Sequence, residues 1–121
     1  METTAKLLED SLLLIWNDRN AENRMEAMQK TYAPDIHFFE NNRGEAIVGY
    51  KAINELISKL QTEWPIEFQF VLNKPSQVNH TTQIVSWNLG PKGAAPVATG
   101  MDVAITENGL IKSLYLFLDG K

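Results

Sequence analysis

The sequence contains no cysteine, which excludes disulfide bonds, thiolate metal ligands and a cysteine nucleophile. It also lacks any apolar run near the roughly 20 residues that a membrane-spanning helix needs. The longest run, Leu12 to Trp16, follows two acidic residues rather than a basic segment, so it does not resemble a signal peptide. We therefore expect a cytoplasmic protein that does not enter a membrane.

Clusters of basic residues are absent too, and the 11 Lys and Arg are outnumbered by 15 Asp and Glu. Binding to nucleic-acid phosphates requires a clustered basic surface, so we expect no nucleic-acid partner. The sequence has neither a Gly-rich phosphate loop nor a G-x-S-x-G nucleophile elbow. Its two histidines, His37 and His80, lack the spacing of metal ligands. We therefore expect neither a metal nor another cofactor.

What is present suits one domain covering residues 1–121, because 44% of the residues are hydrophobic and no repeat or linker interrupts the chain. Apolar residues recur at helical spacing in three segments. The first covers residues 5–16, and the second follows Asn20 as its N-cap and ends before Pro34. The third lies between Gly49 and Pro65. Its amphipathic stripe is the clearest in the chain and consists of Ile53, Leu56, Ile57, Leu60 and Trp64.

Strand patterns dominate the rest of the chain. A short strand is predicted at residues 36–40, and apolar alternation with period two follows in residues 66–72 and 85–89. Residues 97–106 and 110–118 flank Asn108-Gly109, the strongest short signal for a β-hairpin. Helices followed by a run of strands predict an α+β fold with an antiparallel sheet.

The hairpin also predicts a register. With a two-residue turn, Glu107 lies opposite Leu110, so Asp102 faces Tyr115 and Gly100 faces Phe117 on one side of the sheet. That mixed side also carries Ala98, Ala104, Ser113 and Asp119. The other side is aliphatic and carries Val97, Met101, Val103, Ile105, Leu114, Leu116 and Leu118.

These two faces allow two arrangements. In the first, the mixed face lines a hollow under the helices, and the aliphatic face meets a second copy of the chain. In the second, the aliphatic face packs on the helices, and Asp102 and Tyr115 are solvated. The pattern alone leaves both open.

The order and spacing of several motifs resemble the NTF2-like superfamily, in particular its SnoaL-like and ketosteroid-isomerase-like branch, over residues 5 to 119. The motifs are Trp16-Asn17, Tyr32-Ala33-Pro34-Asp35-Ile36, Gly49, Val85-Ser86-Trp87, Gly100-Met101-Asp102-Val103, Asn108-Gly109-Leu110-Ile111 and Phe117-Leu118-Asp119. The resemblance implies three helices packed on a curved antiparallel sheet (a cystatin-like, NTF2-like cone) with a pocket between them. It also implies an inward Asp102 and a homodimer through the convex sheet face.

Ketosteroid isomerases of this branch use a carboxylate base, a protonated carboxylic acid and a tyrosine. Counting from the shared motifs places Glu40 at the base position and Asp102 at the acid position. The tyrosine position falls near Leu12, so that donor is missing. From the derived register we expect Tyr115 to replace it as a donor beside Asp102. Alternatively, Glu40 ends its strand in solvent, and Asp102 with Tyr115 is structural.

The resulting hypothesis is a cofactor-independent isomerase or lyase that acts on a small apolar carbonyl compound through carboxylate acid/base catalysis. Catalysis is assigned to Glu40, Asp102 and Tyr115. The ligand is expected to contact Trp16, Tyr32, Phe38, Trp64 and Phe117. Two alternatives remain, a non-catalytic dimeric module that binds a small ligand, and a purely structural domain with a closed core.

Overall fold

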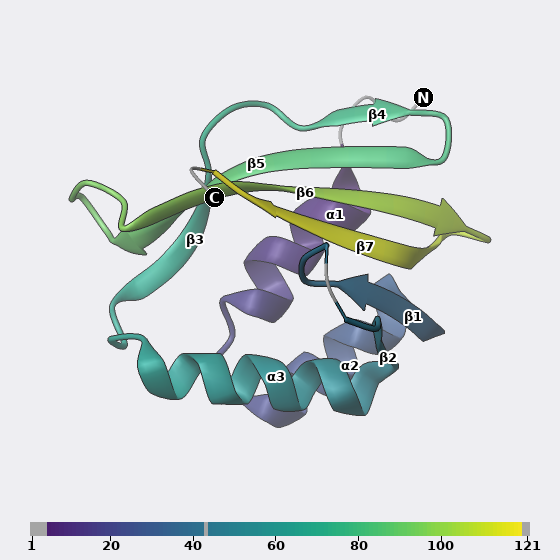
Figure 1. Ribbon diagram of the computed structural model, residues 1–121, viewed down its shortest axis with the longest axis horizontal. Coiled ribbons are helices and arrows are strands. Elements are labelled where there is room, and N and C mark those ends of the chain that lie inside the picture. Colours follow the sequence, from purple (N-terminus) through teal and green to yellow (C-terminus); the bar gives the residue numbers. More distant parts are fainter. Residues whose placement is uncertain (1–4, 43, 120–121) are drawn as a thin grey trace.

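The computed structural model describes residues 5–42 and 44–119, and its helices lie on one side of a curved sheet (Figure 1). Helix α1 (Lys6–Asp10) continues as a π-helical segment, η1 (Ser11–Trp16). Helix α2 (Ala21–Thr31) begins at Asn20, whose side chain accepts a hydrogen bond from the Asn23 amide at 2.9 Å, as its predicted N-cap role requires. Helix α3 (Tyr50–Glu63) begins after Gly49 and ends before Pro65.

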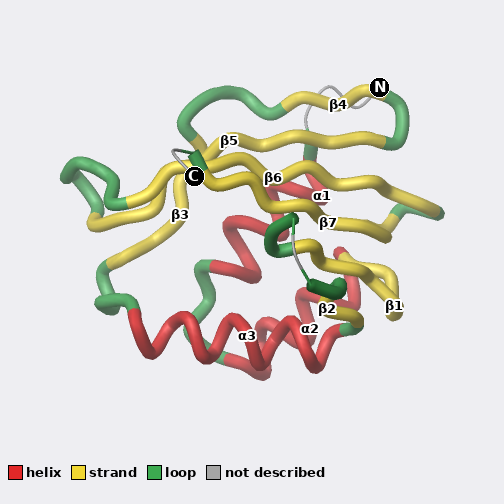
Figure 2. Tube along the Cα trace, in the orientation of Figure 1, coloured by secondary structure: helices red, strands yellow, loops and turns green. Residues whose placement is uncertain are grey.

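The described residues form seven strands of one sheet, in the order β2-β1-β7-β6-β5-β3, with β4 paired to β5 (Figure 2). The strands are β1 (Tyr32–Phe39), β2 (Ile47–Val48), β3 (Phe68–Leu72), β4 (Gln77–Asn79), β5 (Thr82–Pro91), β6 (Ala98–Glu107) and β7 (Leu110–Leu118). The predicted α+β fold, with helices packed on a curved and mostly antiparallel sheet, is confirmed. One pairing departs from the prediction, because β1 lies parallel to β7.

The predicted hairpin turn is also found. Asn108 and Gly109 both have positive φ, 55° and 79°, as a two-residue turn of type I′ requires. Strand β3 begins later than predicted. Ile66 is 81% exposed, because the chain first makes a turn in which the Phe68 amide donates to the Pro65 carbonyl at 3.0 Å.

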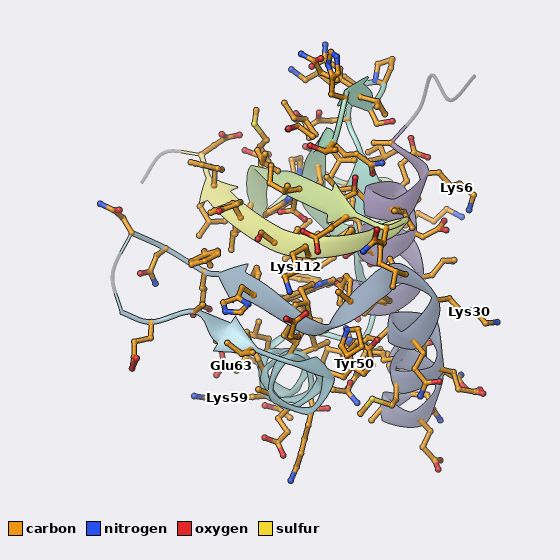
Figure 3. The ribbon with its side chains drawn as sticks, turned by 90° about the vertical axis from the view of Figure 1, so that its right-hand side faces the viewer. Lys6, Lys30, Tyr50, Lys59, Glu63 and Lys112 are labelled. Atoms are coloured by element: carbon orange, nitrogen blue, oxygen red, sulfur yellow. The ribbon has the colours of Figure 1, made fainter. Side chains whose placement is uncertain are left out.

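The predicted register holds only beside the turn. Glu107 pairs with Leu110, but a bulge follows, and from there Asp102 lies opposite Leu116. The extra residue is Lys112 of β7. Its ammonium group forms an ion pair with Asp35 of β1, so a contact with a third strand accompanies the irregularity (Lys112 is labelled in Figure 3). The expected pairing of Asp102 with Tyr115, and of Gly100 with Phe117, is therefore wrong.

A shift of one residue reverses the face of every side chain beyond it. The inner face of β6 and β7 therefore combines Gly100, Asp102 and Ala104 with the leucines of β7, while Tyr115 and Phe117 belong to the outer face with Met101, Val103 and Ile105. Asp102 points inward, as in the first of the two arrangements left open by the sequence, while the second copy of the chain in that arrangement stays a prediction. Across the hairpin, Asp102 and Gly100 lie opposite leucines of β7 rather than opposite Tyr115 and Phe117.

The core lies between this inner face and the helices. Its fully buried members include Leu8, Ile15, Met28, Ile36 and Ile57, contributed by helices and by β1. Helix α3 also reaches β1 through Tyr50, labelled in Figure 3, whose hydroxyl donates to the Tyr32 carbonyl at 2.7 Å. In the described part of the chain, no helix has the length and apolar character needed to cross a membrane.

Candidate active site

A cavity of about 230 Å³ lies between the inner sheet face and the helices. Every layer of the fold contributes to its wall, from η1 through α3 to β7. The described residues that line it are Leu12, Trp16, Phe38, Glu40, Leu60, Trp64, Phe70, Trp87, Leu89, Ala98, Asp102, Leu116 and Leu118. The wall is therefore apolar apart from two carboxyl groups.

The π-helical segment η1 forms one side of the cavity. Its i→i+5 hydrogen bonds make a wider turn than those of an α-helix, and such turns are frequent at functional sites. Leu12 and Trp16 line the cavity from this segment, while Ser11 and Ile15 are buried in the surrounding core.

Aromatic rings make up much of the wall. Phe70 is at the centre, with edge-to-face contacts to Trp87 (centroids 5.0 Å apart), Trp64 (5.7 Å) and Trp16 (6.4 Å). Trp16 also packs against Phe38 at 5.5 Å. This interlocked cluster holds the three tryptophans in place around the cavity.

Asp102 is the buried carboxyl group of the site. Only 7% of the residue is exposed, and its Oδ1 accepts a hydrogen bond from the Trp87 indole Nε1 at 3.0 Å. Burial raises the pKa of Asp102 to about 7, although the bond from Trp87 acts in the opposite direction. Asp102 can therefore both bind and release a proton near neutral pH.

Gly100 makes this hydrogen bond sterically possible. It lies opposite Trp87 across β5 and β6, and a Cβ atom at Gly100 would be 2.5 Å from Cζ2 of the indole. The same Cβ would also be 2.7 Å from the backbone carbonyl oxygen of Phe117. Only glycine lets the indole lie this close to β6, where its N–H reaches Asp102.

Tyr32 lies behind the cavity wall. It is fully buried, and its hydroxyl bonds with Ser11 Oγ at 2.6 Å and accepts from Trp16 Nε1 at 3.2 Å. Burial raises the pKa of the Tyr32 hydroxyl well above its usual range, while its hydrogen bonds with Ser11 and Trp16 act against this rise. This network fixes the position of Trp16.

The structure brings the two expected carboxyl groups to one cavity, with Asp102 inside and Glu40, just after β1, exposed. Of the residues expected to contact the ligand, Trp16, Phe38 and Trp64 line the cavity. The described residues that line it do not include Tyr32, Tyr115 or Phe117. Tyr115 stacks on Phe39 at 4.7 Å, and Phe117 is 55% exposed, because the bulge turns both to the outer face.

Sequence reasoning missed several wall residues, above all Phe70 and Trp87. Both were predicted only to lie on apolar strand faces, and the pairing of the large Trp87 with Gly100, which has no side chain, is visible only in the structure. The hydrogen bond from Trp87 to Asp102 could not be found without the register between β5 and β6.

The sequence matches no protein-family model, and no curated protein is significantly similar to it. Solved structures do match. A candidate isomerase of the SnoaL-like family from Agrobacterium tumefaciens superposes with a TM-score of 0.83 at 23% identity, covering 95% of this chain and 96% of that one.

Two further neighbours have the same fold. A candidate SnoaL-like polyketide cyclase from Jannaschia has a TM-score of 0.74 at 13% identity, covering 94% of this chain and 83% of the other. A protein with a ketosteroid isomerase-like fold from Catenulispora acidiphila, in complex with trimethylamine, has a TM-score of 0.73 at 15% identity, covering 95% and 86%. The resemblance inferred from the motifs is thus confirmed for the fold.

Proposed function

We propose that this chain, which shares its fold with SnoaL-like and ketosteroid isomerase-like proteins, is a cofactor-independent isomerase or lyase acting on a small carbonyl compound. The observation that carries the proposal is Asp102, a buried carboxyl group on the wall of an aromatic cavity with a pKa raised to about 7. A general acid or base works best when its pKa lies near the working pH. Perturbed carboxyl groups in clefts are also typical of active sites.

Asp102 transfers the proton in this reaction. Its ionised form takes a proton from the carbon next to the carbonyl, and the electron pair of the broken C–H bond moves into the enolate. The protonated Asp102 then returns the proton to another carbon, which gives an isomer. If a leaving group departs from the enolate instead, the reaction is an elimination.

Glu40 is the second acid/base group. The sequence assigned the base to Glu40 and a donor role to Asp102, but burial favours Asp102 for the proton transfer, because desolvation makes a carboxylate more basic. Glu40 is exposed and lines the same cavity just after β1. Tyr115 has no part in this proposal, since it lies on the outer face.

The substrate is small. A cavity of about 150 Å³ can hold benzene, whereas drug-sized ligands occupy roughly 300–1,000 Å³. The 230 Å³ found here suits one ring with short substituents or an aliphatic compound of similar size.

Hydrogen–deuterium exchange tests the proposal without knowledge of the natural substrate. Small ketones are incubated with the protein in D₂O, and loss of the α-proton signals is followed by NMR. We expect Asp102→Asn to slow exchange by about 100-fold or more and Glu40→Gln by less. Glu107→Gln, an exposed acid on the same strand as Asp102, is the control and should not differ from wild type. Equal rates in all four proteins would contradict the proposal.

A second candidate is a non-catalytic module that binds a small ligand in the same cavity. The aromatic wall favours it, and a neighbour of the same fold holds trimethylamine. Binding of a ketone without exchange or conversion, followed by NMR and mass spectrometry, would favour this candidate. A structural domain with a closed core is disfavoured by the cavity itself.

We also infer that the protein is cytoplasmic and forms a homodimer through the outer sheet face. Support for the dimer comes from exposed apolar side chains, since Phe117 is 55%, Val97 60% and Val71 44% exposed.

A further inference from the structure

The ionisable side chains among the described residues of the cavity wall all carry charge of one sign. They are Glu40 and Asp102, and both are acids. The chain has 11 Lys and Arg, yet none of the described residues that line the cavity is Lys, Arg or His. The described part of the wall therefore offers an anionic ligand no cationic partner.

The arginines on the helix side of the cavity are engaged elsewhere. The Arg19 guanidinium donates to the carbonyl oxygens of Gln61 at 3.1 Å and Pro65 at 2.8 Å, at the end of α3. Arg24 is buried between α2 and α3, where it bonds with Asn54 and Gln61. Neither arginine neutralises the acids of the cavity.

The aromatic part of the wall also favours a positive ligand. Five of the described residues that line the cavity are aromatic, and three of these are tryptophans. Aromatic ring faces carry negative potential and attract ammonium groups, with tryptophan the strongest of the natural rings. This attraction increases where water is excluded.

We propose that the cavity binds small organic ammonium ions, and that the substrate of the proposed reaction is a carbonyl compound bearing a positively charged nitrogen. The ammonium group lies among the aromatic rings, with Asp102 and Glu40 as counter-charges. The assignment of the substrate rests on the proposed function, whereas the preference for cations concerns the cavity alone.

A positive substrate would also supply a cationic group, which the described residues of the wall do not contain. An enolate needs stabilisation of its negative oxygen. The first helix has Leu12 on the wall where the resemblance implies a tyrosine, and two of the three indole N–H groups of the described wall, those of Trp16 and Trp87, already donate to Tyr32 and Asp102. A cationic nitrogen within the substrate can stabilise the enolate from inside the same molecule.

Binding of a cation should depend on pH through Asp102. The titratable groups that face Asp102 are Glu40 at the cavity wall and Tyr32 behind it, while β5, β7, η1 and α3 present uncharged side chains there. A cation favours the ionised carboxylate, so its affinity should rise as the pH increases from 6 to 8.5. A neutral ligand should show no such increase.

The test uses three probes of nearly equal shape, namely choline, its neutral isostere 3,3-dimethylbutan-1-ol and the anion 3,3-dimethylbutanoate. Dissociation constants are measured at pH 8.5 by NMR titration. We expect choline to bind at least fivefold more tightly than the alcohol, and the anion to bind most weakly. Asp102→Asn should reduce the preference for choline to less than twofold while affinity for the alcohol changes little. Glu107→Gln should leave all three constants unchanged.

Equal or tighter binding of the alcohol, or no binding of choline at millimolar concentration, would overturn the inference. A preference for choline that survives Asp102→Asn unchanged would also overturn it. These outcomes are separate from those of the exchange experiment. If exchange depends on Asp102 but the cavity shows no preference for cations, the proposed function stands and the inference of a cation site is wrong. If choline binds preferentially but no exchange occurs, the cation site stands and the proposed function is wrong.

Discussion

Arg24 and Asp102 are both buried, yet their surroundings differ in kind. Arg24 is 1% exposed between α2 and α3, and its guanidinium donates to Asn54 Oδ1 (2.6 Å), the Asp18 carbonyl (2.7 Å), Gln61 Oε1 (2.9 Å) and Ser58 Oγ. Asp102 receives one hydrogen bond from the described residues, that of Trp87. All three nitrogens of the Arg24 guanidinium donate hydrogen bonds, whereas the Asp102 carboxyl group borders a cavity.

This difference separates a structural role from a functional one. Burial lowers the pKa of Arg24, and the charge of Asp18 acts against this, but arginine keeps its proton in proteins. Its hydrogen bonds compensate for the lost hydration. For Asp102 the compensation is incomplete, and the carboxyl group responds with a raised pKa. An incompletely satisfied charge is available to a ligand.

The largest effect is expected at Arg24. Arg24→Met should lower the free energy of unfolding by about 4 kcal/mol, because it leaves several buried acceptors without a donor. Urea denaturation measures the loss. Arg24→Lys is the informative second variant. It keeps the charge but cannot reproduce the planar fork, so it should recover less than half of the loss. Full recovery by lysine would show that charge alone matters there.

The opposite sign is expected at Asp102. Between pH 4 and pH 7 the folded protein keeps a proton that the unfolded chain has released, so burial of Asp102 lowers stability progressively over this range. Asp102→Asn removes this cost and should be more stable than wild type by about 4 kcal/mol at pH 8, and nearly equal to it at pH 4. Urea denaturation at both values measures the difference. If the gap between the two proteins does not change with pH, Asp102 is ionised normally in the folded state.

A smaller loss is expected at Gly100. Gly100→Ala should cost about 2 kcal/mol, because the new methyl group overlaps the Trp87 ring and the Phe117 carbonyl. Displacement of the indole would break its bond to Asp102, and the pKa of Asp102 should rise further, which carboxyl NMR titration can detect. Adding Trp87→Phe removes the clash with the indole only. The double variant should therefore regain stability without lowering the pKa of Asp102.

Local signals predicted much of the fold. Asn20, Gly49 and Pro65 bound the helices as expected, and Asn108-Gly109 forms the turn. Non-local features could not be predicted in this way. Parallel pairing of β1 with β7 joins segments far apart in the sequence, and the π-helical turn at Ser11–Trp16 has no local signature.

The same division between local and non-local features explains which residues of the site were predicted correctly. Asp102 points inward as expected, because its strand alternates regularly from the turn back to Ala98. Tyr115 and Phe117 were misplaced by one extra residue, Lys112, whose partner Asp35 lies 77 positions away in the chain. The alternation of side chains along a strand cannot reveal a bulge that accompanies a contact distant in sequence. The prediction therefore assigned every side chain of β7 after Lys112 to the wrong face of the sheet.

The smallest effect on stability is expected for a substitution on the outer face of β7, which can be compared with one on its inner face. Leu116 lines the cavity, and its neighbour Phe117 lies on the outer face, half exposed. Phe117→Ser should change stability little at a fixed protomer concentration but convert the inferred dimer to a monomer, as measured by light scattering at about 20 μM, because it removes apolar surface from the interface. Leu116→Ala should leave the dimer intact but weaken binding of a ligand in the cavity. A wild-type protein that is already monomeric at this concentration would contradict the dimer, and it would leave the outer aromatic residues without a role in assembly.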